Sequence, residues 1–225
     1  MEPNKNPQIK LEEMLSNAET KGKTLFLHSC CAPCSSYVLT YLRSTFKITV
    51  FYYNPNITAD EEFRKRADEE KRFIDALNRD EEAASGRAYT ITYVEGEHDP
   101  NLFLEAVKGY EQCPERGERC AICFRLRLSE TAKEAAKIGA DYYATTLTLS
   151  PLKDAVLLNR IGEEEGKKYH VNYLPTDFKK KGGYLKSIEL SKEYALYRQD
   201  FCGCMFSKAE RAKQKSERGE TYADG

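Results

Sequence analysis

The stretch Thr-Leu-Phe-Leu-His at residues 24–28 decides the fold, because it runs directly into Ser29-Cys30-Cys31 and then into Ala-Pro-Cys at residues 32–34. A short apolar run of this length is typical of a strand buried in a parallel sheet. Pro33 suits the first turn of a helix, which we expect to cover residues 35–44. The stretch therefore predicts a strand whose carboxyl end carries two adjacent cysteines, followed at once by a helix.

Further strands and helices alternate along the rest of the chain. Strands are predicted at residues 24–28, 47–53, 89–94, 141–147 and 169–174. Helices are predicted at residues 8–19, 35–44, 59–78, 102–107, 121–138 and 154–165, and again from residue 188 on with an interruption at 200–204. This alternation favours the α/β class, with a doubly wound, mostly parallel five-stranded sheet. We expect a single domain over residues 1–225, with a helical C-terminal region over 188–212 and a flexible tail over 213–225.

Composition and charge narrow the classes of function. The chain is 40% hydrophobic, with a formal net charge of −1, which argues against a surface that coats nucleic acid indiscriminately. No apolar stretch reaches about 18 residues and the N-terminus is polar, so we expect no membrane span and no secretory signal. The expected location is the cytoplasm, where clustered cysteines are more often metal ligands or catalytic groups than structural bridges.

Six of the eight cysteines form three tight sets. The sets are Cys30-Cys31, Cys120-x-x-Cys123 and Cys202-Gly203-Cys204. The helix that begins near residue 121 should start at the edge of the sheet where the first strand ends, so the first two sets can meet. Four thiolates suit tetrahedral zinc or a [4Fe–4S] cluster, and an adjacent pair, which chelates one small ion poorly, favours the cluster. Zinc, and a plain role as core thiols, stay open as alternatives.

The Cys202-Gly203-Cys204 set differs from the others, because two thiols one residue apart close only a small, strained disulfide ring. Strain raises the reduction potential of a disulfide, which suits a reversible electron relay, and Gly203 lets the backbone bend tightly. Two further metal ligands or an ordinary turn are the alternatives. Cys34 and Cys113 could each support the site from behind or be an extra metal ligand, but small buried thiols are common and are the favoured interpretation.

Three ordered signatures carry a family resemblance. They are His28-Ser-Cys-Cys-Ala-Pro-Cys-Ser35, Arg119-Cys-Ala-Ile-Cys-Phe-Arg125 and Asp200-Phe-Cys-Gly-Cys-Met-Phe206. With them the chain resembles, over residues 23–206, the iron–sulfur, cobalamin-independent epoxyqueuosine reductases of the QueH family. The resemblance implies a sheet related to the nucleotide alpha-hydrolase folds. It also implies reduction of epoxyqueuosine at the wobble position of tRNA to queuosine, the last step of queuosine biosynthesis.

The resemblance also implies roles for single residues. It implies a [4Fe–4S] cluster bound by Cys30, Cys31, Cys120 and Cys123, and a redox-active pair at Cys202 and Cys204. It leaves room for an additional iron, and the reaction needs an electron-donor protein or another reductant beside the tRNA. A zinc-bound tRNA-binding protein and a metal-free thiol–disulfide oxidoreductase are the rival classes of function.

Basic segments near residues 116–127 and 178–186 are candidates for contacts with tRNA phosphates. The candidate contacts are Arg119, Arg125, Lys179, Lys180 and Lys181, with Tyr184 as a surface on which a base could stack. Charges at Arg119 and Arg125 would also stabilise an anionic cluster at the adjoining cysteines.

Overall fold

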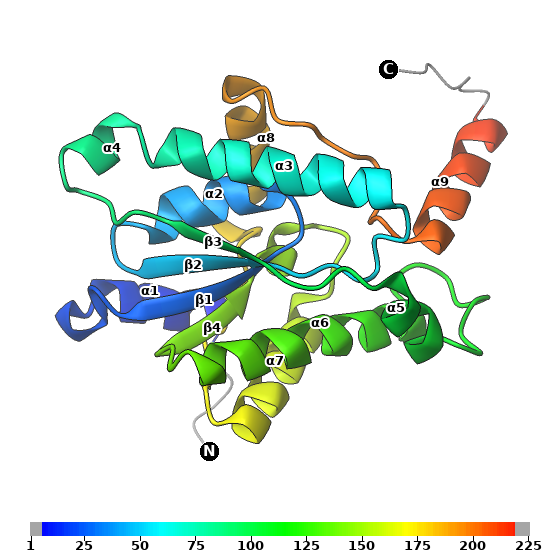
Figure 1. Ribbon diagram of the computed structural model, residues 1–225, viewed down its shortest axis with the longest axis horizontal. Helices are drawn as coiled ribbons and strands as arrows, with labels where there is room; N and C mark the ends of the chain where they lie inside the picture. The colour runs from blue at the N-terminus through cyan, green and yellow to red at the C-terminus, as the bar shows by residue number, and fades with distance from the viewer. Residues whose placement is uncertain (1–5, 219–225) are drawn as a thin grey trace.

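The computed structural model describes residues 6–218, which contain a five-stranded, all-parallel sheet with helices on both faces (Figure 1). The strands are β1 (Thr24–Ser29), β2 (Lys47–Tyr52), β3 (Thr92–Glu95), β4 (Tyr142–Thr145) and β5 (Asn172–Tyr173). Their order across the sheet is β3-β2-β1-β4-β5, and each neighbouring pair is parallel. The predicted α/β class with a parallel five-stranded sheet is confirmed.

Local hydrogen bonds explain where strand ends differ from the prediction. β3 begins at Thr92, because the side-chain amide of Asn78 binds both the N–H and the carbonyl of Ile91, at 2.8 and 2.9 Å. β4 ends at Thr145, whose hydroxyl accepts a hydrogen bond from the N–H of Leu147 and turns the chain into a 3₁₀ helix, Thr146–Leu149. Side-chain hydrogen bonds of this kind compete with strand pairing and shorten both elements.

The helices follow the predicted order, with changes near the C-terminus. They are α1 (Pro7–Ser16), α2 (Ala32–Leu42), α3 (Asp60–Leu77), α4 (Glu81–Ala84), α5 (Pro100–Ala106), α6 (Glu118–Lys137), α7 (Ala155–Tyr169), α8 (Gly183–Glu193) and α9 (Met205–Glu217). α8 begins at Gly183, earlier than residue 188, and the irregular segment 194–204 is longer than the predicted interruption. Residues 213–217 of the expected tail are helical, whereas residues 219–225 lie outside the described residues. Within residues 6–218, no helix combines the length and the apolar character that crossing a bilayer would need.

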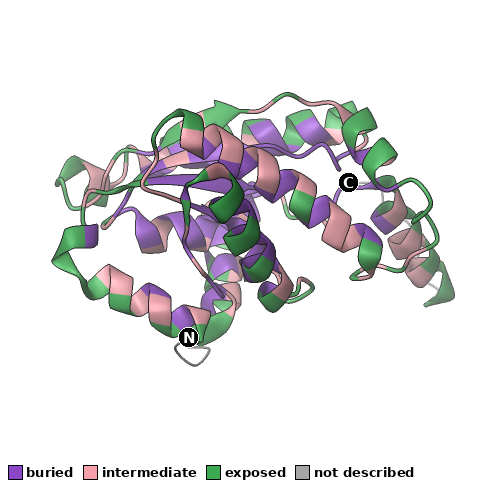
Figure 2. Cartoon of the chain, turned by 90° about the horizontal axis from the view of Figure 1, so that it is seen from below, coloured by how far each residue is buried: buried purple, intermediate pink, exposed green. Residues whose placement is uncertain are grey.

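Side chains of β1 alternate between two apolar cores, one on each face of the sheet. Leu25 and Leu27 pack in the core that contains residues of α2 and α3, and Phe26 packs in the core that contains residues of α6 and α7. Figure 2 shows the result, with buried residues concentrated in the strands and on the inner sides of the helices. Because both faces are covered, the strands read as nearly continuous apolar runs.

The chain order changes direction between β1 and β4, and ligands of such sheets bind outside the carboxyl ends of the strands at this switch point. Cys30 and Cys31 directly follow β1, and the 3₁₀ helix Thr146–Leu149 directly follows β4. In Figure 1 the first turn of α6 and the whole of α9 lie at this same end of the molecule. The topology therefore brings all three predicted cysteine segments to one edge.

Gly162, within α7, allows the helix to lie close to β5, and we expect Gly162→Ala to destabilise the fold. A Cβ atom at this position would lie 2.3 Å from Cε2 of Tyr173. Alanine gains about 1 kcal/mol over glycine in a helix, but overpacking costs about 1–3 kcal/mol, so the free energy of unfolding should fall by about 1–2 kcal/mol. Urea unfolding measures this change. The exposed neighbour gives a matched control, Glu163→Ala, which should change stability by less than about 0.5 kcal/mol. A Gly162→Ala protein as stable as the parent would contradict the packing argument.

Candidate functional site

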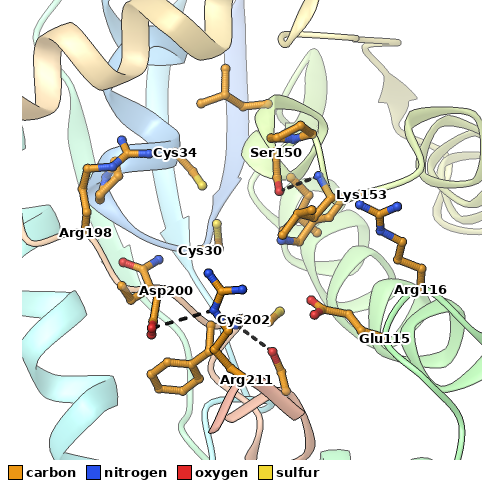
Figure 3. A pocket seen from close by; sticks show the side chains of 18 of the residues that line it. Cys30, Cys34, Glu115, Arg116, Ser150, Lys153, Arg198, Asp200, Cys202 and Arg211 are labelled. Carbon is orange, nitrogen blue, oxygen red and sulfur yellow. Dashed lines mark hydrogen bonds and ion pairs between the residues drawn. The ribbon is translucent and has the colours of Figure 1, made fainter. Parts of the chain in front are cut away.

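A pocket of about 380 Å³ opens at the carboxyl edge of the sheet (Figure 3). Cys30, directly after β1, and Cys34, in the first turn of α2, form one wall. Lys153 and Arg116 lie across from them, and Cys202 comes from the segment before α9. The basic residues that line it are Arg66, Arg116, Arg127, Lys153, Arg198 and Arg211, and the acidic ones are Glu115, Asp200 and Glu210. The excess of cations gives the pocket a positive potential that favours anionic groups.

The first turn of α2 gathers three thiols. Cys31 is the N-cap residue of α2 and Pro33 lies in its first turn, as predicted. The Sγ atoms of Cys30, Cys31 and Cys34 all lie within 4.8 Å of one another, an arrangement that could hold a metal ion. Cys34, for which the sequence left a buried thiol and an extra ligand open, lies beside Cys30 and Cys31 and lines the pocket, because the helical turn returns residue 34 to the side of residues 30 and 31.

The thiols of this group differ in their pKa values. Hydrogen bonds from Cys31 and Cys34 lower the pKa of Cys30 well below its usual value, and the charges of Lys153 and Arg127 add to this effect. Conversely, the thiols of Cys31 and Cys34 donate hydrogen bonds to Cys30. This raises the pKa of Cys31 to about 12 and also raises the pKa of Cys34. Cys30 is therefore the thiolate of the group, and the thiolate is the form that binds metals.

The two cysteines of α6 lie in this region but do not join that group. Cys123 is 7% exposed and belongs to a buried apolar cluster that also contains Cys204. Cys120 is half-buried, packs against the core that contains Cys30 and Cys31, and accepts a hydrogen bond from the N–H of Arg116 at 3.3 Å. Among residues 6–218, neither α6 cysteine belongs to a set of three metal-binding groups within 4.8 Å. The four predicted ligands are therefore not arranged around one ion.

A buried arginine fixes the segment that carries Cys202 and Cys204, both of which are free thiols. Arg66 of α3 donates to the carbonyls of Cys202 at 3.1 Å and Phe201 at 3.4 Å. Gly203 has a φ of +118°, and a Cβ atom there would lie 2.8 Å from Cγ1 of Ile57, so this turn needs glycine. The predicted tight bend at Gly203 is confirmed, and Arg66 is a residue that the sequence alone did not reveal.

Next to the pocket lies a buried polar cluster of Arg127, His28 and Asn54, which the sequence alone did not reveal. Arg127 of α6 donates from Nε to Nε2 of His28 at 3.2 Å and from a terminal nitrogen to Oδ1 of Asn54 at 2.6 Å. Burial, followed by the charge of Arg127, lowers the pKa of His28 to about 3, so the imidazole is neutral. A sequence signal existed, because Cys120, Cys123 and Arg127 follow a helical spacing that places them on one face of α6.

Comparison with known proteins decides the family. A family model described as epoxyqueuosine reductase QueH matches residues 25–210. The chain belongs to the QueH family. Relatives named epoxyqueuosine reductase QueH include those of Streptococcus pyogenes serotype M1, 40% identical over 84% of this chain and 72% of the relative, and Staphylococcus epidermidis, 39% identical over 88% and 82%. The relative from Thermotoga maritima is 33% identical over 86% of this chain and 95% of its own length. The predicted family and the predicted enzyme class, an oxidoreductase, are confirmed.

A solved structure supports the fold of this QueH-family chain. The U34-tRNA thiolase NcsA from Methanococcus maripaludis, determined with its [4Fe-4S] cluster, matches 95% of this chain and 73% of its own chain with a TM-score of 0.52. The sequences are 14% identical, so the likeness concerns the arrangement of helices and strands.

The arginines proposed to contact tRNA in this QueH-family chain have structural partners. Arg119 is 3% exposed and donates to the carbonyl of Glu111 at 2.8 Å, which holds the loop before α6. Arg125 forms ion pairs with Glu164 and Glu165 of α7, at 2.6 and 2.8 Å. Neither lines the pocket of Figure 3. Helical position explains this result, because residues next to a cysteine in sequence point to other sides of α6.

The lysine run at residues 179–181 also lies outside the pocket lining, whereas Tyr184 is part of it. Lys179 pairs with Asp177 at 3.2 Å, and Lys181 pairs with Glu12 of α1 at 2.5 Å. The cations that do line the pocket come from isolated positions in the sequence, such as Lys153, Arg198 and Arg211. Their grouping depends on the fold, so charge runs in the sequence could not reveal it.

Glu70 of α3 gives a pH-dependent contribution to stability. It is fully buried and accepts a hydrogen bond from the hydroxyl of Ser35 at 2.6 Å. Burial raises the pKa of Glu70 from 4.5 to about 8, so the folded chain keeps a proton that the unfolded chain releases. Between these pH values the contribution falls as the pH rises, by up to about 1.4 kcal/mol per pH unit.

We therefore expect Glu70→Gln, which keeps the shape but cannot ionise, to remove this part of the pH dependence. Urea unfolding of the metal-free protein at about pH 5.5 and about pH 7.5 should show a smaller loss of stability for Glu70→Gln than for the wild type. Asp68→Asn, an exposed position of the same helix, should leave the slope unchanged. Equal slopes for Glu70→Gln and the wild type would show that Glu70 is ionised in the folded chain.

Proposed function

We propose that the chain reduces the epoxide of epoxyqueuosine, at the wobble position of tRNA, to give queuosine. The proposed cluster ligands are Cys30, Cys31, Cys120 and Cys123, which would hold a [4Fe–4S] cluster, and the proposed redox pair is Cys202 and Cys204. The observation that supports it is the gathering of thiols from three distant segments, in a chain of the QueH family. Cys30, Cys34 and Cys202 line one cationic pocket, while Cys120 packs against the core of Cys30 and Cys31, and Cys123 packs with Cys204.

The residues present fit an iron–sulfur cluster. Thiolates are the ligands that such clusters take, and each of four cysteines binds a different iron atom. Cys120 packs against the core that contains Cys30 and Cys31, and Cys123 is buried beside Cys204, so both lie near the group of Cys30, Cys31 and Cys34 without joining it. Cys34 is then free to serve as a ligand of an additional iron in the pocket.

The Cys202–Cys204 pair matches the electron count of the reaction. Converting an epoxide to an alkene breaks both C–O bonds, releases the oxygen as water and takes up two electrons and two protons. Two thiols that join in one disulfide release two electrons and two protons. The cluster, when bound, supplies one-electron transfer between this pair and the substrate. A donor protein must then reduce the disulfide before the next turnover.

The pocket lining offers contacts for a nucleotide of tRNA. Arg116, Arg198 and Arg211 can neutralise phosphates, and the ring of Tyr184 can stack on an exposed base. An anticodon is a single-stranded loop whose bases can turn out of the stack, which is how proteins usually read RNA sequence. A tRNA substrate places the reaction in the cytoplasm.

The decisive experiment is anaerobic purification followed by analysis of iron, zinc and acid-labile sulfide, and by a conversion assay. The assay supplies tRNA that carries epoxyqueuosine and a chemical reductant, and measures queuosine in the digested nucleosides. We expect a brown protein with about four iron atoms per chain and formation of queuosine. Stoichiometric zinc in a colourless, inactive protein, or full turnover without metal, would each contradict the proposal.

A further inference from the structure

Arg127 is a buried cation without an ordinary partner. It is 1% exposed, and among residues 6–218 no carboxylate lies within ion-pair distance of it. Its neighbours carry no charge. The imidazole of His28 is neutral, and the amide of Asn54 does not ionise. Burying an unpaired charge costs several kcal/mol, so the fold must offer this guanidinium an anion.

The guanidinium is held by two hydrogen bonds, and one of its three nitrogens has no partner. Nε and one terminal nitrogen are occupied by His28 and Asn54, and the Nδ2 atom of Asn54 donates in turn to the carbonyl of Ser29 at 2.9 Å. The other terminal nitrogen, Nη1, is buried and has no hydrogen-bond partner. A buried guanidinium N–H without a partner indicates a ligand or counter-ion that belongs at this position.

The cysteines that lie near Arg127 indicate what that counter-ion is. Cys123 lies one turn before Arg127 on the same face of α6, within reach of a side-chain hydrogen bond, and Cys30 is among the residues that line the pocket. Cys30 and Cys123 come from the two cysteine pairs assigned to the cluster. Arg127 also lines the pocket directly. The guanidinium therefore lies near one cysteine of each pair assigned to the cluster.

We infer that Arg127 sets the reduction potential of the iron–sulfur centre by donating a charge-assisted hydrogen bond to its sulfur atoms. The inference rests on the proposed ligand set. A cluster with four thiolates is anionic and gains one more negative charge on reduction, so a fixed buried cation favours the reduced form. Hydrogen bonds to cluster sulfurs act in the same direction.

The test is a potentiometric titration of the loaded protein, followed by electron paramagnetic resonance of the reduced cluster. In Arg127→Gln the ratio of reduced to oxidised cluster at a given applied potential should fall at least about tenfold, which is about 59 mV for a one-electron couple. Arg127→Lys keeps the charge and should shift the ratio less. Arg125→Gln removes the same side chain two positions away, where it is 48% exposed and paired with glutamates, and should match the wild type.

A second variant covers the case in which Arg127→Gln does not fold or does not hold the cluster. Asn54→Asp leaves the guanidinium in place but sets a carboxylate against it, and it should lower the reduced fraction in the same direction. A cluster of unchanged potential in Arg127→Gln, or in Asn54→Asp when the first variant is lost, would overturn the inference and leave the proposed ligands standing. A wild-type protein that binds no iron would refute the ligand set instead.

Discussion

Serine at position 202 or 204 is expected to stop turnover without removing the cluster. Each of Cys202→Ser and Cys204→Ser removes one half of a disulfide, and half a disulfide stores no electron pair. The single variants and the double variant should therefore lose activity to the same extent, by at least about 1,000-fold, as happens when reacting groups act as a unit. The conversion assay with epoxyqueuosine-containing tRNA measures this loss.

Cys113→Ser is the matched control, because Cys113 is a half-buried free thiol in the loop before α6 that lies outside the pocket lining. It should keep wild-type activity. The iron and sulfide contents of all these variants should equal that of the wild type. Undiminished turnover of the double variant with a chemical reductant would exclude the dithiol relay, and loss of iron in either single variant would make these thiols ligands instead.

Removing a proposed ligand should remove the cluster itself, unlike the variants of Cys202 and Cys204, which should keep it. We expect Cys30→Ala and Cys123→Ala to lose most of their iron and sulfide and to lower activity by at least about 100-fold. Even substitutions of residues that hydrogen-bond to metal ligands lower metal affinity or activity about 10–100-fold. Both thiols are nearly buried, at 8% and 7% exposure, and alanine has no atom that could replace the sulfur as a ligand. Metal and sulfide analysis, together with the visible absorption of the anaerobically purified protein, measures the loss.

Cys34→Ala distinguishes two possible ligand sets. In one, Cys30 and Cys31 act with Cys120 and Cys123, and in the other they act with Cys34. The [4Fe–4S] proposal predicts that Cys34→Ala keeps the cluster, although its sulfur lies within 4.8 Å of those of Cys30 and Cys31. A Cys123→Ala protein with full iron content, beside a Cys34→Ala protein with none, would move the metal to the Cys30, Cys31 and Cys34 group and contradict the proposed set.

The sequence predicted the parts of this molecule that depend on local pattern. The apolar run at 24–28 and the proline at 33 placed β1 and α2, and the parallel sheet then placed Cys30 and Cys31 at its carboxyl edge. The start of α8 at Gly183 was missed because it depends on tertiary packing. A Cβ at Gly183 would lie 1.9 Å from the carbonyl oxygen of Phe178 and 2.6 Å from the ring of Tyr37, so only the fold explains this glycine.

The same distinction holds within the site. Ligands that recur in tight sets stand out in a sequence, whereas Arg66, Lys153 and the triad of His28, Asn54 and Arg127 come from single positions on different elements. Among the charged residues that did stand out, Arg119, Arg125, Lys179 and Lys181 are occupied by loop carbonyls or by ion pairs outside the pocket. From the basic segment at residues 116–127, however, Arg116 and Arg127 do line the pocket, so clustering of charge along the chain predicted only part of the clustering in space.

The segment that bears Cys202 and Cys204 follows α8, long after Cys123 in the sequence, and is held at the pocket by hydrogen bonds from Arg66 to its carbonyls. During translation, residues 30–123 leave the ribosome well before this segment does. The order of synthesis thus permits a cluster to be inserted while the pocket is still incomplete. Residues 201–204 would add their part of the pocket wall afterwards. Maturation and closure of the enzyme would be separable events in time.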